Sequence, residues 1–517
     1  MASMLHPQIV HGGENRNTAR NRDKHGDENR VRDRDTNSAA HVLIFPLPYQ
    51  GHVNSMLKLA ELLSIAGLRV TFLNSDYNQH RLLSHSDVLD RFSRFPAFQF
   101  QTISDGIPLD NPRSAHQLLQ LFNSLNTTTK HLFRDRLLSL YPRPSSIIVD
   151  GAMTFAIDIA KELGLPIFAF RTISACAFWA YFCLPRLLQS GELPFDDDDM
   201  DKPIKSVPGM ESFLRRRDLP SFCRARDLSD PILQRVMTET LNAPRATALI
   251  LNTMEELEGP ILSQIRSHCP NLYTVGPLHA LLNNSQSQNR PPSQSGISSN
   301  SLWAEQRSCI KWLDSHPTKS VVYVSFGSLA VVRKEEMVEF WHGLVKSEKP
   351  FLWVVRPGLV GLDGAGAGAA AAVEEEELVE GTRQRGCLVE WAPQEEVLNH
   401  RAVGAFLTHS GWNSTLEGVF ARVPMICWPY FADQQMNSRF VSEVWGVGVD
   451  MKDECERGVV ERMVREVMDE GVRRDELRRR ADEVGDMAAT SVGDDGSSFC
   501  DLGRLVQDLR HIGLSRQ

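Results

Sequence analysis

The chain has 517 residues, of which 42% are hydrophobic and 23% charged, and its formal net charge is −9. This length exceeds what one hydrophobic core serves, so we expect two domains. The negative charge, with no basic patch interleaved with aromatic residues, argues against nucleic acid and acidic membranes as partners, and we expect no nucleic-acid partner.

The cysteines and the N-terminal segment indicate where the protein works. Nine cysteines lie scattered without CxxC pairs, as buried thiols do in a reducing compartment. Residues 1–39 mix charges of both signs with almost no aliphatic side chains, which predicts a disordered, charged leader and not a signal peptide. No apolar run reaches the roughly 18 residues of a membrane helix. We expect a cytoplasmic monomer without an integral membrane segment.

Predicted strands and helices alternate through the first half of the chain. HVLIFPLP (41–48) predicts a strand, the stretch after it an amphipathic helix, and LRVTFLN (68–74) a second strand. Further on, SSIIVD (145–150) and LPIFAFRT (165–172) predict buried strands on either side of a helix. Because such alternation builds parallel sheets covered by helices, residues 40–280 are predicted to form a doubly wound N-terminal domain.

A second series of strands follows a polar stretch. Residues 281–301 are rich in Ser, Asn, Gln and Pro without an apolar period, which predicts a flexible linker. SVVYVSFGSL (320–329) and PFLWVVR (350–356) begin the predicted strands of a second domain, residues 302–495. Residues 496–517 contain a predicted helix that can return to the N-terminal domain. The predicted fold class is α/β, with two Rossmann-like domains facing each other across a cleft.

Three stretches argue against other functions. GAGAGAAAAVEEEE (364–377) follows no strand directly, so it predicts a surface insertion and not a phosphate loop. FDDDDMD (195–201) lacks His and Cys, so it predicts a solvated loop, and no metal site is assigned. LPYQGHVN (47–54) replaces the GxGxxG that a nicotinamide oxidoreductase carries after its first strand.

Residues 391–434 contain two strand-loop-helix units that predict one ligand cleft. The strand VGAFLTHS (403–410) leads into a helix start, and free N–H groups at a helix start bind phosphate. The strand VPMICWP (423–429) leads to Asp433, a predicted N-cap of the next helix. Ligands lie at the carboxyl ends of parallel strands, so one cleft should collect Trp391, His409, Asn413, Ser414, Asp433 and Gln434. Singly, Trp391 could instead be a core or rim residue, His409 a loop histidine, and Asp433 an ordinary cap.

Two further residues form a candidate catalytic pair. His52 follows the first strand and Asp150 ends another strand of the same predicted sheet, so both can reach one rim. Histidine is a suitable base near neutral pH, and an aspartate can orient the ring and stabilise its charged form. Both residues could equally serve the helices that follow them, and their spacing does not show that they touch.

The box from Trp391 to Gln434 resembles the signature of the plant family of UDP-dependent glycosyltransferases of small metabolites. Two positions depart from it, Ser410 where the family usually has Cys, and Arg422 where it usually has Gly; the second matters if the position needs a positive φ. The resemblance extends from about Ala40 to Ile512 and is strongest to the 7-deoxyloganetate glucosyltransferase-like branch. The matching positions are Trp391, Ala392, Pro393, Gln394, His400, Gly404, Phe406, Thr408, His409, Gly411, Trp412, Asn413, Ser414, Glu417, Pro424, Pro429, Asp433 and Gln434.

The resemblance implies a GT-B architecture and a UDP-sugar site. Trp391 would stack on uracil and Glu417 would hold the ribose, while Asp433 and Gln434 would hold the sugar, with Gln434 favouring glucose. His409, Asn413 and Ser414, with Ser328 of the SFGS motif, would hold the diphosphate in place of a metal ion. Ala392, Gln394 and Trp412 complete the predicted donor set, and no cofactor is implied besides UDP-glucose as donor substrate.

The same resemblance implies the reaction. His52 in its QGHxN context would deprotonate an acceptor with help from Asp150, and direct displacement of UDP would invert the anomeric carbon to a β-glucoside. The residues themselves place a small hydrophobic acceptor in the N-terminal half, in a pocket that Phe45, Tyr49, Phe178 and Trp179 could wall, although these side chains could equally be core packing. An acidic acceptor could be oriented by Arg171 or Arg215. The first candidate for the acceptor is a monoterpenoid or iridoid, and the second is a flavonoid or another phenolic. A catalytically silent sugar-nucleotide sensor stays open.

Overall fold

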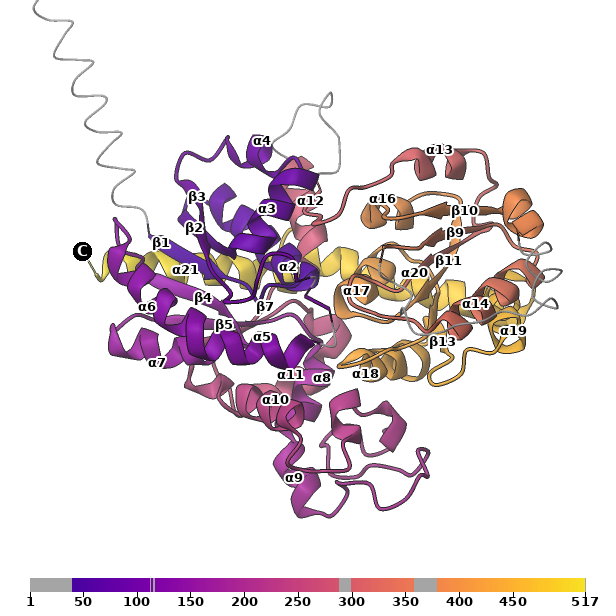
Figure 1. Cartoon of the computed structure of the whole chain (residues 1–517), viewed down its shortest axis with the longest axis horizontal. Coiled ribbons are helices and arrows are strands. Elements are labelled where there is room, and N and C mark those ends of the chain that lie inside the picture. Colours follow the sequence, from indigo (N-terminus) through magenta and orange to yellow (C-terminus); the bar gives the residue numbers. More distant parts are fainter. Residues whose placement is uncertain (1–39, 112, 115–116, 288–298, 358–378, 517) are drawn as a thin grey trace, which may run out of the picture.

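The computed structural model describes residues 40–111, 113–114, 117–287, 299–357 and 379–516 (Figure 1). The predicted leader 1–39 and the Gly/Ala-rich insertion 364–377 lie outside the described residues. No described helix is long and apolar enough to cross a membrane.

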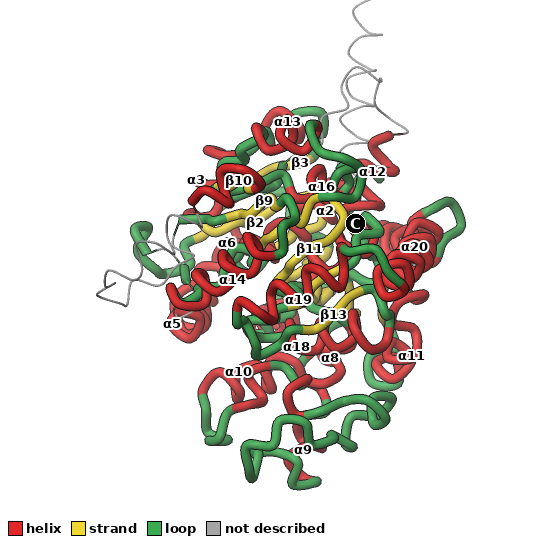
Figure 2. Tube along the Cα trace, turned by 90° about the vertical axis from the view of Figure 1, so that its right-hand side faces the viewer, coloured by secondary structure: helices red, strands yellow, loops and turns green. Residues whose placement is uncertain are grey.

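Two parallel sheets form the centres of two domains. The first has the order β3-β2-β1-β4-β5-β6-β7 and the second β10-β9-β8-β11-β12-β13. Apart from the edge strands β3 and β10, which are only partly buried, the strands are mostly buried apolar runs, as expected for parallel sheets covered on both faces. Figure 2 shows the strands enclosed by helices. The strands are β1 (His41–Phe45), β2 (Arg69–Ser75), β3 (Phe98–Ile103), β4 (Ser146–Asp150), β5 (Ile167–Arg171), β6 (Ala248–Leu251), β7 (Leu272–Thr274), β8 (Val321–Ser325), β9 (Phe351–Val354), β10 (Gly386–Val389), β11 (Val403–Thr408), β12 (Met425–Cys427) and β13 (Gly448–Asp450).

The helices cover these sheets and meet between them. Those that precede the C-terminal sheet are α2 (Gln50–Ile65), α3 (Asp76–His85), α4 (Val88–Phe92), α5 (Leu118–Ser124), α6 (Lys130–Ser139), α7 (Phe155–Glu162), α8 (Ala175–Phe182), α9 (Leu184–Gln189), α10 (Pro231–Leu241), α11 (Glu255–Arg266), α12 (Leu278–Ser287) and α13 (Ser308–Asp314). The others are α14 (Lys334–Lys346), α16 (Gln394–Leu398), α17 (Trp412–Phe420), α18 (Gln434–Arg439), α19 (Arg457–Met468), α20 (Val472–Val492) and α21 (Ser497–Leu514).

The stretch predicted as a linker, residues 281–301, is partly helical. Helix α12 runs to Ser287, because Leu278, Leu281 and Leu282 bury an apolar face against the N-terminal core. The polar composition after Leu282 hid this helix. The linker expectation was therefore wrong for residues 281–287, and residues 288–298 lie outside the described part of the chain.

The C-terminal helix lies on the N-terminal domain, where Figure 1 shows α21 in yellow along the first sheet. Asp501 accepts a hydrogen bond from the backbone N–H of Thr274 at 2.8 Å, and Asp508 accepts one from the Tyr273 hydroxyl at 2.5 Å. A buried indole also joins the two domains, since Trp412 donates to the carbonyl of Asn252 at 2.7 Å. The carboxyl ends of the two sheets thereby face each other.

Candidate active site

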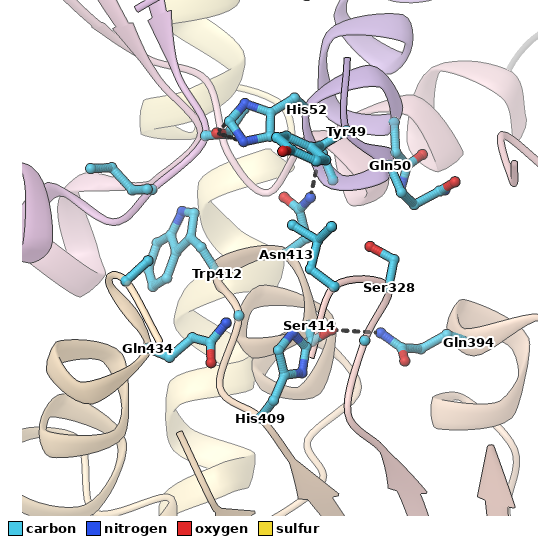
Figure 3. Close-up of a pocket in the computed structure, with 18 of the residues that line it drawn as sticks. Tyr49, Gln50, His52, Ser328, Gln394, His409, Trp412, Asn413, Ser414 and Gln434 are labelled. Carbon is cyan, nitrogen blue, oxygen red and sulfur yellow. Dashed lines mark hydrogen bonds between the residues drawn. The ribbon is translucent and has the colours of Figure 1, made fainter. Parts of the chain in front are cut away.

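One cavity of about 330 Å³ lies between the carboxyl ends of the two sheets. Figure 3 shows side chains from both domains converging on it. The structure brings every predicted catalytic and donor-binding residue to this cavity: His52, Asp150, Ser328, Trp391, Ala392, Gln394, His409, Trp412, Asn413, Ser414, Glu417, Asp433 and Gln434.

The candidate catalytic pair is in contact. Strands β1 and β4 are direct neighbours, with Phe45 opposite Val149, so the residues that follow β1 and end β4 reach the same rim. His52 lies in the first turn of α2, and its Nδ1 is 2.6 Å from Oδ2 of Asp150. The side chain of His52 is 24% exposed and that of Asp150 only 2%, so the ring can meet a substrate while the carboxylate cannot.

The environment of Asp150 keeps it ionised. Burial alone would raise its pKa, but the charge and hydrogen bond of His52, the N–H of Ala152 and the charge of Arg171 together hold the pKa below its usual range. An ionised carboxylate only accepts hydrogen bonds, so we assign the His52 proton to Nδ1. The lone pair of Nε2 is then the basic site of the ring.

Thr172 is a further residue of the site that the sequence analysis did not predict. Its hydroxyl oxygen lies 2.9 Å from Nδ1 and 3.4 Å from Nε2 of His52. Thr172 directly follows β5, the neighbour of β4, so the strand-end argument that found Asp150 could also have found it.

The start of α17 presents free N–H groups that can bind an anion. The first intrahelical bond runs from Thr415 N to Gly411 O at 2.9 Å, so the N–H groups of Trp412, Asn413 and Ser414 precede it and have no intrahelical acceptor. Such a helix start attracts anions. The side chains of Trp412 and Asn413 are otherwise engaged, since the Asn413 amide donates to Gly51 O at 2.9 Å. These two residues therefore join the domains through their side chains and face the cavity with backbone groups.

His409 is packed as a neutral ring beside this helix start. Burial lowers its pKa to about 4, so at physiological pH the ring carries one N–H to donate. A Cβ at Gly327 or Gly411 would lie 2.5 Å from His409 Nε2, and only glycine leaves this space open. Gly327 also has a φ of +72°, which favours glycine.

A hydrogen-bond network holds the proposed ribose site. The amide nitrogen of Gln394 donates to Ser414 Oγ at 2.8 Å and to Glu417 Oε2 at 2.6 Å. Burial raises the pKa of Glu417 to about 7, against the attraction of Lys58. Lys58 of α2 forms an ion pair with Glu395 across the domain boundary.

Asp433 and Gln434 lie at the start of α18, and Asp433 occupies the predicted N-cap position without capping the helix through its side chain. Its side chain makes no capping bond and instead accepts from the Asn437 amide at 2.7 Å. Burial raises the pKa of Asp433 to about 6. Gln434 Oε1 accepts the N–H groups of Tyr430 and Phe431 at 2.8 and 3.0 Å, and its Nε2 has no acceptor among the described residues. The carboxamide is thus fixed with its donor end available.

The acceptor end of the cavity differs from the prediction. Phe45, Phe178 and Trp179 are buried in the core and do not line the cavity, because the apolar runs that contain them pack against their own domain. Arg215 is paired with Asp218 and Asp201 and does not line the cavity, whereas Arg171 does. The walls include Leu47, Tyr49, Leu118, Phe122, Ile173, Tyr181, Phe222 and Val236.

Both departures from the family signature fall at positive φ, 60° for Ser410 and 58° for Arg422. A non-glycine residue there costs about 1 kcal/mol. Arg422 forms an ion pair with Asp486 at 2.5 Å, so the side chain that replaces glycine has gained a surface partner.

The chain is similar to known glycosyltransferases over nearly its whole length. Residues 295–479 match the family "UDP-glucoronosyl and UDP-glucosyl transferase". A 7-deoxyloganetic acid glucosyltransferase from Catharanthus roseus is 52% identical over 487 residues, 92% of this chain and 99% of that protein. A myricetin 3-O-rhamnoside 1,2-glucosyltransferase from Crocosmia x crocosmiiflora is 45% identical, over 92% of this chain and 96% of that protein.

Solved structures agree with this assignment. A UDP-glucose: anthocyanidin 3-O-glucosyltransferase in complex with UDP has a TM-score of 0.75 at 26% identity, over 91% of this chain and 99% of that one. Os79 from O. sativa in complex with UDP has a TM-score of 0.74 at 27% identity, over 90% and 100%. The chain therefore belongs to the plant family of UDP-dependent glycosyltransferases, has their GT-B fold, and is a glucosyltransferase.

Proposed function

We propose that the protein transfers glucose from UDP-glucose to a hydroxyl or carboxyl of a small terpenoid, an iridoid or another monoterpenoid, and that the product is a β-glucoside. The observation that carries this proposal is the hydrogen bond of 2.6 Å between His52 and a buried Asp150 at the rim of the cavity. A sensor that only bound sugar nucleotides would not need a base oriented in this way.

In the proposed step, His52 Nε2 removes the acceptor proton while the acceptor oxygen attacks the anomeric carbon. The bond from that carbon to the diphosphate oxygen breaks, and UDP leaves with the bonding electrons. Asp150 stabilises the imidazolium that forms. The helix start at Asn413 and Ser414, with His409, stabilises the charge that develops on the diphosphate, as a metal ion does in other enzymes. Attack from the face opposite UDP inverts the configuration.

The acceptor class is proposed from the walls of the cavity and the relatives. Mainly apolar side chains line the acceptor end, and the buried Arg171 offers the one described cation on that wall. A relative at 52% identity is named for 7-deoxyloganetic acid, an acidic acceptor. A flavonoid glycoside is the second candidate, since a relative at 45% identity is named for one.

The proposal is tested by incubating the enzyme with UDP-glucose and a panel of iridoid, monoterpenoid and flavonoid acceptors, with and without a chelator. Mass spectrometry should detect glucosides of the terpenoids and equal rates in both conditions. Mild alkaline hydrolysis separates the two linkages, because only ester glucosides are cleaved. Tight UDP binding without any product would favour the sensor, and a flavonoid preference would favour the second candidate.

Donor binding should depend on pH through Glu417. Ribose hydroxyls donate best to an ionised carboxylate, and the pKa of Glu417 is about 7, so affinity should fall as the pH drops below 7. Protonation of Glu417 alone should weaken UDP-glucose binding about 10-fold between pH 8 and pH 6. Calorimetry without acceptor measures this directly, because the diphosphate diester does not titrate in that range.

The matched control is Glu417→Gln. Asp433, with a pKa of about 6, titrates in the same window and should leave a residual dependence of about 2-fold. An unchanged pH dependence in Glu417→Gln would contradict the assignment of the ribose contact to Glu417.

A further inference from the structure

The indole of Trp391 is stacked on a second indole, that of Trp303. Their ring centroids are 5.8 Å apart and their planes differ by 25°. Trp391 lines the cavity and Trp303 does not. Trp303 therefore backs Trp391 from outside the cavity, and the face of Trp391 that remains can receive a flat base.

Trp303 belongs to residues 299–306, here called the joining segment, which connects the domains and is held by the N-terminal one. The guanidinium of Arg81 lies 4.2 Å from the centroid of the Trp303 ring, and its Nε donates to the carbonyl of Leu302 at 3.0 Å. Trp303 packs on the N-terminal core, whereas Trp391 lies just after β10 of the C-terminal sheet. The stacked indoles are thus a contact between the two domains.

The joining segment is also tied to the helix that carries His52. Gln50 Oε1 accepts the N–H of Leu302 at 2.7 Å, and its amide nitrogen donates to the carbonyl of Asn300 at 3.4 Å. On the other side, the carbonyl of Trp391 accepts the N–H of Gln306 at 2.9 Å. The segment is therefore anchored to both domains, with Asn300 at the wall of the cavity.

We propose that Trp303 is a positioning residue for the donor, the middle layer of a stack of Arg81, Trp303 and Trp391 on which uracil is the next layer. This inference rests on the proposed role of Trp391. A stacked aromatic pair and a cation over a ring each favour a fixed ring orientation. A base that meets an indole already held in place binds more tightly, because less freedom is lost on binding.

The test compares binding of UDP and uridine by calorimetry, together with steady-state kinetics, in Trp303→Leu and Trp303→Phe. The loss acts at the nucleoside end, so Trp303→Leu should raise Kd for both ligands by the same factor, about 10-fold. Trp303→Phe keeps a ring in the stack and should stay within about 3-fold of wild type. With UDP-glucose, KM should rise while kcat at saturation changes little.

Trp312→Leu is the matched control, because Trp312 of α13 is another partly buried tryptophan with a ring partner, His316 at 4.0 Å between centroids, and it does not line the cavity. Arg81→Gln removes the outer layer without touching a core residue and should give the same pattern at about 3-fold. It keeps the test decisive if Trp303→Leu does not fold.

Trp391→Leu separates the proposed role of Trp391 from that of Trp303. Normal UDP binding in Trp391→Leu would contradict the proposed contact between Trp391 and uracil. Weak binding there, with Trp303→Leu and Arg81→Gln no different from Trp312→Leu, would overturn only the role of Trp303. Weaker UDP binding with unchanged uridine binding in Trp303→Leu would also overturn it, because the lesion would then lie at the diphosphate.

Discussion

Replacing His52 with alanine is expected to lower kcat for a hydroxyl acceptor about 10³-fold, within the range that a positioned general base contributes. The ring Nδ1 is 2.6 Å from Asp150, which leaves Nε2 as the base. UDP should bind as tightly as to wild type, because the predicted donor contacts come from other residues. Rates from product formation and Kd from calorimetry give both quantities.

Asp150→Asn is the companion variant because it preserves shape. The new amide can donate to Nδ1, which moves the ring proton to Nε2 and blocks the base, so a loss of similar size is expected although the imidazole is intact. With a carboxylic acceptor, already ionised at neutral pH, His52→Ala should cost less than about 10-fold. Full activity of His52→Ala toward a hydroxyl acceptor would refute the proposed base.

The strand order explains why the sequence predicted His52 and Asp150 as candidates but could not predict that they are in contact. The apolar runs predicted two strands, and they placed His52 and Asp150 at the carboxyl ends of these strands. Their contact depends on β1 and β4 being neighbours although a long stretch of chain separates them, and no local pattern encodes that pairing. Once the order is known, Thr172 after β5 follows by the same logic.

The walls of the acceptor pocket could not be predicted from the sequence. In strands and helices that are buried on all sides, hydrophobicity does not distinguish a side chain facing the core from one facing a cavity. Phe45 stacks on Phe133 at 5.1 Å, and the indole of Trp179 donates to the carbonyl of Pro208. Ile173 and Tyr181, from the same apolar run as Trp179, do line the cavity.

Composition also concealed the joining segment. A polar, Pro-containing stretch predicts a linker because it has no apolar period. That prediction uses the average composition of the stretch and does not identify single residues that make specific contacts. Asn300, Ser301 and Glu305 are nevertheless at the cavity, because hydrogen bonds from Leu302 to Gln50 and from Gln306 to Trp391 hold the segment there.

Replacing Asp433 with alanine is expected to lower kcat/KM for UDP-glucose about 10²-fold, as the loss of hydrogen bonds to a charged group would. Kd for UDP should stay within about 2-fold, because Asp433 is assigned to the sugar and not to the nucleotide. Initial rates at varied UDP-glucose and calorimetry with UDP measure the two quantities. The bond from Asn437 is also lost, at a cost of about 1 kcal/mol in the free energy of unfolding, so thermal unfolding should accompany the kinetics.

Asp433→Asn and Gln434→Glu divide that effect between charge and geometry. Asparagine still accepts from Asn437 but carries no charge, and because the pKa of Asp433 is about 6, the advantage of wild type over Asp433→Asn should shrink as the pH falls through 6. Glutamate at 434 keeps the bonds from Tyr430 and Phe431 but loses the amide donor, so KM should rise about 10-fold. Equal losses for UDP and UDP-glucose in Asp433→Ala would place this carboxylate at the nucleotide, and the sugar site would have to be sought elsewhere in the cavity.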